Sequence, residues 1–282
     1  MNFQNLWRSL CRQPMALTGG AILVGLAASA MFAPFIAPYD PLEQNLYHRL
    51  SPPSLANLFG TDEFGRDIFS RIVHGARITL RVGGVCIAIS LTAGTLIGLA
   101  AGYCGTYVDT LLMRFVDLIL AFPSILLAIS VVSVIGPGID NVMIAVGIVM
   151  IPQFARVVRS SVLSVSQMPY VDAAKALGSQ DHRTILWTVL PNCLAPLIVQ
   201  STISMATAIL DAAGLSFLGL GAQPPAPEWG AMLNSGRDLM IVAPWVMTFP
   251  GIAIFMVALG FNMFGDGLRD ILDPRTDRLI SQ

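Results

Sequence analysis

The sequence predicts an all-α, polytopic membrane protein with six transmembrane helices. Of the 282 residues, 55% are hydrophobic and only 12% are charged, whereas soluble domains carry about 25% charged residues. The mean hydropathy is +0.70, and long apolar runs divide the chain. One or two soluble domains of this length would have too few charges to solvate their surface. The net charge of −1 also provides no basic surface for nucleic acid.

Six apolar runs are predicted to span the membrane. A spanning helix needs about 20 mainly apolar residues, because the hydrocarbon core is ~30 Å thick and each residue rises ~1.5 Å. The run at 141–155 is shorter, and we count it as a span because Gln153 and Arg156 could lie at the membrane interface. The other five runs contain no charged residue: 13–39, 82–108, 118–139, 184–210 and 239–265.

The first run is predicted to be a retained membrane anchor. Arg8 and Arg12 precede it, as in a signal peptide, but its apolar stretch exceeds the roughly 7–15 residues of a signal core. The expected organisation is a cytoplasmic tail, an anchor helix, an extracytoplasmic segment, a core domain with five transmembrane helices and a second cytoplasmic tail. Their respective bounds are 1–14, 15–38, 39–81, 82–266 and 267–282, with a cytoplasmic loop at 156–191 inside the core domain.

The distribution of basic residues predicts that both termini are cytoplasmic. Six spans place the two termini on one side, and that side then carries ten Arg and Lys residues against six on the other. An excess of Arg and Lys marks the cytoplasmic loops of membrane proteins. The segment 39–81 is the exception, since it holds five arginines but also five acidic residues. Long loops cross the membrane despite their charge, so we place this segment outside.

The outer segment is predicted to end in an amphipathic helix. After Asp67, the residues Ile68, Ile72, Ala76 and Leu80 recur at helical spacing. This helix is expected to lead into the second span.

The chain lacks the residues that would make it an ATPase or a hydrolase. Its only lysine, Lys175, stands between two alanines, so no G-x-x-x-x-G-K-[ST] phosphate-binding loop is present. Neither H-E-x-x-H nor G-x-S-x-G occurs, and the four cysteines form no C-x-x-C pair. Asp117 and Asp211 lie near predicted span ends, where an interfacial carboxylate bonded to a neighbour is the ordinary interpretation and proton coupling is the alternative. The chain is therefore predicted not to be an enzyme and to hold no cofactor or metal.

The polar segment between the fourth and fifth predicted spans has the pattern of two short helices. Pro169 suits the first turn of a helix, and Asp172 lies near its N-terminal end, where negative charge is favoured. Gly178 is placed to end this helix in the left-handed conformation. Ser179 is then expected to cap a second helix that runs to Pro191, where the fifth span begins.

This segment resembles the cytoplasmic EAA loop of ABC-importer permeases, whose pattern is E-A-A-x3-G-x9-I-x-L-P. Asp172 stands where the family has Glu, and Thr188 stands where it has Ile. The positions that fit the pattern are Asp172, Ala173, Ala174, Gly178, Leu190 and Pro191. The resemblance implies that these residues couple the permease to an ATPase.

Three further motifs resemble the dipeptide, oligopeptide, nickel and glutathione permeases, and more narrowly their C-type subunit. They are "GTDEFGRDIFSR" at 60–71, "LSFLGLGAQPPAPEWGAML" at 215–233 and "FNMFGDGLRDILDP" at 261–274. The resemblance implies the type I importer permease fold in a bacterial inner membrane. It also implies a second homologous permease, two cytoplasmic ATPases that bind ATP and magnesium, and a periplasmic or lipoprotein substrate-binding protein.

The substrate and the transport class stay open at the level of sequence. Peptides, glutathione, opines and nickel chelates all fit permeases of this kind. A stand-alone secondary transporter or channel is the alternative to an ATP-driven importer. That alternative predicts transport by this chain alone.

Overall fold

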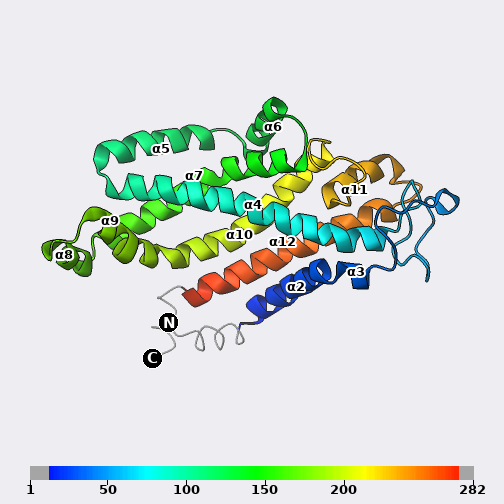
Figure 1. The fold of residues 1–282 in the computed structure, drawn as a ribbon, viewed down its shortest axis with the longest axis horizontal. Helices are drawn as coiled ribbons and strands as arrows, with labels where there is room; N and C mark the ends of the chain where they lie inside the picture. Colours follow the sequence, from blue (N-terminus) through cyan, green and yellow to red (C-terminus); the bar gives the residue numbers. More distant parts are fainter. Residues whose placement is uncertain (1–12, 273–282) are drawn as a thin grey trace.

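The protein is an elongated bundle of long helices that lie side by side (Figure 1). The computed structural model describes residues 13–272, so most of the two expected tails, 1–14 and 267–282, lies outside the described residues. Within the described range there is no strand. Five helices are long and apolar enough to span a membrane: α2 (Pro14–Met31), α4 (Ile68–Tyr103), α7 (Ile139–Ser166), the stretch Asp181–Phe217 that contains α10 (Leu190–Phe217), and α12 (Trp245–Leu272).

The third expected span, 118–139, is wrong as a single helix. The chain there forms α5 (Thr106–Leu120) and α6 (Ser124–Ile135), which meet at an angle of 91°. Pro123 explains the break, because proline has no N–H for the helix ladder and its ring clashes with the carbonyl of the preceding turn. If the bent pair counts as one span, the described residues contain six spans, as the sequence predicts.

Helix α4 contains both the predicted amphipathic helix and the predicted second span. It runs without interruption from Ile68 to Tyr103, so the boundary expected between 81 and 82 lies inside one helix. Asp67 caps the helix, since its carboxylate accepts a hydrogen bond from the Ser70 N–H over 2.8 Å. The helix also stops earlier than the expected limit of residue 108, because Gly105 follows with a φ of +98°.

Two other spans are longer than predicted. Helix α7 continues to Ser166, eleven residues beyond the expected end at Ala155. Helix α12 continues to Leu272, so the cytoplasmic tail expected from residue 267 begins as helix.

Glycines allow α4 and α7 to approach closely. Gly94, Gly98 and Gly102 follow one another at four-residue spacing and therefore share one face of α4. A Cβ at Gly98 would lie 2.6 Å from the Cβ of Val158, and one at Gly102 would lie 2.8 Å from the Cβ of Val162. Small residues at such spacing let helix backbones touch in membranes, where close packing drives helix association.

A folded cap covers the end of the bundle opposite α8 (Figure 1). We define the cap as residues 37–67 and 221–244. It contains the short helices η1 (Leu46–His48), α11 (Trp229–Gly236) and η3 (Arg237–Leu239), and α3 (Ala33–Ile36) leads into it. Trp229 donates to the carbonyl of Ile72 over 3.1 Å, which fixes α11 against α4.

A buried ion network holds the two parts of the cap together. Arg66 donates to Asp62 over 2.6 Å, and Arg71 lies 3.7 Å from the same carboxylate. Arg71 also donates to the carbonyls of Pro41 and Pro225, over 3.0 and 3.3 Å. The motifs at 60–71 and 215–233, far apart in the sequence, therefore meet at one arginine.

Glu228 is buried and stands at the N-cap position of α11. Its carboxylate accepts hydrogen bonds from the N–H groups of Gly230 and Ala231, over 2.9 and 2.7 Å. Burial raises the pKa of Glu228 above its ordinary value, although both backbone donors act in the opposite direction.

Candidate functional site

The expected coupling residues lie at the end of the molecule opposite the cap (Figure 1). Helix α7 ends at Ser166, α8 follows at Pro169–Ala176 and α9 at Asp181–Thr184. The chain then passes through a π-helical turn at Ile185–Val189 directly into α10. The predicted start of the fifth span at Pro191 is therefore wrong, because the helix is continuous from Asp181 to Phe217.

Helix α8 is anchored by Val171 and presents most of its other described side chains outward. Val171 is fully buried, and its N–H donates to the carbonyl of Met168 over 2.9 Å. Tyr170 is 45% exposed, Leu177 just beyond the helix is 90% exposed, and Ala173 is also exposed. Their spacing of three and four residues places all three on one face. The described part of the chain leaves about half of Tyr170 and nearly all of Leu177 uncovered.

Asp172 and Ala174 complete the described surface of α8. Asp172 lies in the first turn of the helix and is exposed, whereas Ala174 is partly covered. An acidic residue at this position is favoured by the partial positive charge of the helix N-terminus. The exposed surface thus combines one carboxylate with small and apolar side chains.

Gly178 ends α8 in the left-handed conformation that the sequence predicts. Its φ is +83°. The Ser179 N–H donates back to the carbonyl of Ala174 over 3.1 Å, and the Leu177 N–H donates to Ala173 over 3.0 Å. This pattern satisfies the last carbonyls of the helix and requires a residue with positive φ. A Cβ at Gly178 would meet no atom within 4 Å, so only the backbone conformation restricts this position.

The segment after Gly178 is held by contacts that the sequence did not indicate. Ser179 does not cap α9: the N-cap position is Gln180, and the Ser179 hydroxyl accepts instead from Thr184 over 3.0 Å. The Tyr103 hydroxyl donates to the Asp181 carboxylate over 2.8 Å, which ties the start of α9 to the end of α4. Residues 78 positions apart carry no local sequence signal for such a contact.

The other two expected coupling residues, Leu190 and Pro191, lie in the first turn of α10. Leu190 is partly covered and Pro191 is exposed. The structure therefore divides the predicted set into a group on α8 and its end, and a pair at the start of α10.

Two ion pairs join α7 to α5 near this end. Asp117 pairs with Arg156 over 2.6 Å, which confirms the interpretation of Asp117 as a carboxylate bonded to a neighbour. Asp109 accepts two hydrogen bonds from the guanidinium of Arg159. Asp211 differs from expectation, because α10 continues to Phe217 and so places this residue inside the helix rather than at its end.

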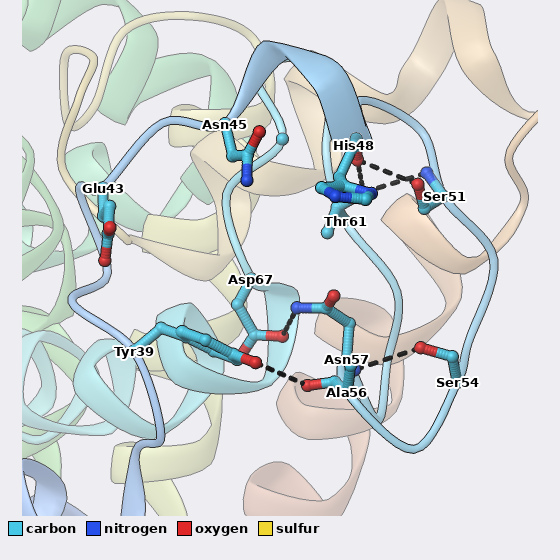
Figure 2. Close-up of a pocket in the computed structure, with 11 residues that line it drawn as sticks. Tyr39, Glu43, Asn45, His48, Ser51, Ser54, Ala56, Asn57, Thr61 and Asp67 are labelled. Carbon is cyan, nitrogen blue, oxygen red and sulfur yellow. Dashed lines mark hydrogen bonds between the residues drawn. The ribbon is translucent and has the colours of Figure 1, made fainter.

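The cap contains a second candidate region, a cavity of about 410 Å³ (Figure 2). Its polar side chains mostly bond to one another or to the backbone. The Tyr39 hydroxyl donates to the carbonyl of Ala56 over 3.1 Å, and the Asn57 amide donates to Asp67 over 2.9 Å. Among residues 13–272, no group of three or more His, Cys, Asp and Glu is placed to hold a metal ion. The cavity wall is thus a folded loop that its own hydrogen bonds stabilise.

The chain belongs to the family of binding-protein-dependent transport system inner membrane components, whose model matches residues 94–278. A second model, the N-terminal transmembrane domain of oligopeptide transport permease C, matches residues 2–53. The chain is thus a multi-span permease subunit of a bacterial ABC importer in the inner membrane, as the four sequence motifs predict.

Similar proteins come from several bacteria. The chain is 49% identical to the dipeptide transport system permease protein DppC of Alkalihalophilus pseudofirmus, over 97% of this chain and 90% of that protein. It is 48% identical to the glutathione transport system permease protein GsiD of Escherichia coli, with the same coverage of both chains. Among solved structures, the MetNI methionine ABC transporter in an inward-facing conformation has a similar fold. That match has a TM-score of 0.57, an identity of 18% and a coverage of 72% of this chain and 97% of that chain.

Proposed function

We propose that this chain transmits the energy of ATP hydrolysis to the import of short peptides, with α8 as the element that contacts a partner ATPase. The observation that carries the proposal is the outward face of α8, formed by Tyr170, Ala173 and Leu177 beside the Asp172 carboxylate. Small and apolar side chains around one charge suit a groove on another protein, since they allow close approach. The full sequence contains no phosphate-binding loop. ATP and magnesium are therefore bound by partner ATPase chains.

A second permease subunit is part of this proposal. The two ion pairs described above join helix α5 to α7, and α5 turns an apolar stripe outward. The stripe consists of Tyr107, Leu111, Phe115 and Leu118, all of them exposed. Their spacing places them on one face of the helix, which supports packing against a homologous permease in a heterodimer.

The orientation that we propose places α8 and both termini in the cytoplasm and the cap outside. The excess of Arg and Lys on the side of α8 supports this arrangement. The cap then faces the compartment from which a periplasmic or lipoprotein binding protein delivers the substrate.

The substrate class rests on the named relatives. One is a dipeptide permease and another a glutathione permease, at nearly equal identity. Dipeptides and glutathione are both short peptides with free carboxylates and an ammonium group. We propose a substrate of this class.

Reconstitution in proteoliposomes tests the proposal. The chain with its co-permease, ATPases and binding protein should take up a labelled dipeptide or glutathione only with ATP inside the compartment that holds the ATPases. The purified chain alone should neither hydrolyse ATP nor take up peptide. Uptake by the lone chain under an ion gradient would contradict the proposal and favour a secondary transporter.

A further inference from the structure

The Asp211 carboxylate lies inside the membrane span that contains α10. Six residues separate it from Phe217, where α10 ends, so it lies about 9 Å below that end. The Gly138 N–H donates to the carbonyl of Leu220 over 2.9 Å, so α7 begins where α10 ends, beside the cap. Asp211 is half-buried. A carboxylate at such a position is unfavourable unless it pairs with another group.

Asp211 lacks the kind of partner that charged residues on neighbouring spans have. Arg81 of α4 pairs with Asp140 of α7 over 2.8 Å, and two arginines of α7 pair with acidic residues of α5. Asp211 forms no hydrogen bond or ion pair with any residue in the described part of the chain. Its electrostatic interaction with Cys86 of α4 supplies no positive charge. The carboxylate is therefore free to bind a cation from another molecule.

The carboxylate belongs to an open stripe of α10, formed by Thr207, Asp211, Gly214 and Leu218. These residues follow one another at spacings of four, three and four, so they share one face of the helix. Thr207 and Leu218 are exposed, and the two residues between them are partly exposed. The stripe lies beside α6, because a Cβ at Gly214 would lie 3.7 Å from the Cδ1 of Ile125.

Gly214 leaves space next to the carboxylate. The distance of 3.7 Å to Ile125 is an ordinary van der Waals contact, so an alanine would fit at this position. Glycine in the middle of a helix is less favourable than alanine. Packing within the described chain therefore does not require this glycine. Its effect is to leave room for a ligand beside Asp211.

The open stripe adjoins the surface that we propose to pack against a second permease. Exposed apolar side chains continue from Leu118, near the end of α5, through Phe122 to Ile125, which lies beside Gly214. A homologous permease that packs against α5 would enclose this surface between the two subunits. Asp211 would then line the space through which the substrate passes.

We propose that Asp211 binds the α-ammonium group of the imported peptide as the peptide passes between the two permeases. The inference rests on the proposed function, which supplies both the peptide substrate and the paired subunits. The ammonium group has the charge that this carboxylate lacks within the described chain. An Arg or Lys of the second permease fits less well, because a permanent ion pair away from water needs close packing and further hydrogen bonds around it. The space at Gly214 favours a ligand that enters and leaves.

Uptake of a dipeptide and of its N-acetylated form, which has no ammonium group, tests the proposal. Each is supplied at a concentration that saturates the binding protein, in proteoliposomes with the complete complex and ATP. The wild type should take up the free dipeptide about tenfold faster, the size of one charge-assisted hydrogen bond. Asp211→Asn should lower uptake of the free dipeptide about tenfold and leave uptake of the acetylated form unchanged. Asp211→Glu should restore part of the difference, and Gly214→Leu should slow both peptides by filling the space.

Two control variants make the same changes outside the stripe. Asp266→Asn removes an exposed carboxylate of α12, and Gly25→Leu adds a side chain at an open position of α2. Both should behave as the wild type does. Unchanged uptake of the free dipeptide in Asp211→Asn would overturn the inference.

An ion pair with the second permease gives a different result. Asp211→Asn would then slow both peptides equally and lower the Tm of the complex without substrate, and this outcome would also overturn the inference. If Asp211 is unpaired until the peptide arrives, the Tm of the variant without substrate should equal or exceed that of the wild type. Failure of the wild type to take up either peptide would instead contradict the proposed function itself.

Discussion

The hydroxyl of Tyr103, the last residue of α4, donates a hydrogen bond to the carboxylate of Asp181, the first residue of α9. The contact joins the proposed coupling segment to the helix with the most extensive packing against α7. A push on α8 would therefore reach α4 through this bond as well as through α7.

Tyr103→Phe should weaken this connection while leaving the ring in place. Hydrogen bonds to charged groups contribute about 1.5–3 kcal/mol when buried, and this pair is partly exposed, so we expect a smaller effect of about 1 kcal/mol. In reconstituted complex, the stimulation of ATP hydrolysis by loaded binding protein should fall about two- to fivefold. Basal hydrolysis should persist. Tyr47→Phe is the control, since it removes the same atom from an exposed tyrosine of η1.

Gly98→Ala should destabilise the bundle, because the new Cβ would lie 2.6 Å from the Ala155 carbonyl oxygen and from the Val158 Cβ. Forcing an extra carbon into a packed contact costs about 1–3 kcal/mol. Gly84→Ala is the matched control on the same helix, since a Cβ there meets no atom within 4 Å. Thermal unfolding in detergent should give a lower Tm for Gly98→Ala only. Equal Tm values would mean that α4 and α7 do not touch at Gly98.

Glu228 predicts a pH dependence of the cap. Its pKa is raised in the folded protein by burial, so the folded state binds the proton more readily than the unfolded state. Stability from this group therefore increases as the pH falls from neutral through the raised pKa towards the ordinary value of about 4.3. Glu228→Gln removes the titration. The Tm at pH 5 minus the Tm at pH 7 should be more positive for the wild type than for the variant. An identical value in both proteins would contradict the burial of a titrating carboxyl.

Topology follows from the proposed orientation and can be measured separately. Reporter fusions after Ser179 and after Gln282 should both indicate the cytoplasm, and a fusion near Asn57 should indicate the outer face. A cytoplasmic signal from the fusion near Asn57 would contradict the orientation.

The spans could be predicted from hydropathy, but their lengths could not. Arg156 and Arg159 ended the uncharged stretch of the fourth span, yet the helix continues past both. Their pairing with Asp117 and Asp109 of α5 allows charges to stay on the helix. Apolar content also concealed the break at Pro123, although proline by itself was a local signal that the helix would end.

In the candidate site, the features set by neighbouring residues could be predicted, and the contacts between distant residues could not. The left-handed conformation of Gly178 could be predicted from the neighbouring residues, because the hydrogen bonds that end such a helix are made to its own last carbonyls. The bond between Tyr103 and Asp181 depends on where two distant helices end, and no spacing in the sequence encodes it. Ser179 does not cap α9 as predicted, and its hydroxyl instead accepts a hydrogen bond from Thr184, five residues later.

Gly178→Val tests whether α8 couples the partner ATPases to transport. A β-branched residue at φ +83° is strained by about 1–2 kcal/mol, while the open space around it excludes a steric clash with other elements. Gly178→Asn should be milder, because asparagine adopts this conformation more readily. Gly25→Val is the control, since that α2 glycine also has open space but no positive φ.

The measurement is uptake and binding-protein-stimulated ATP hydrolysis in proteoliposomes, normalised to the amount of assembled complex. Gly178→Val should assemble normally and retain basal hydrolysis, while peptide uptake and stimulation should both fall severalfold. Wild-type uptake and stimulation in Gly178→Val would contradict the role of this bend in coupling.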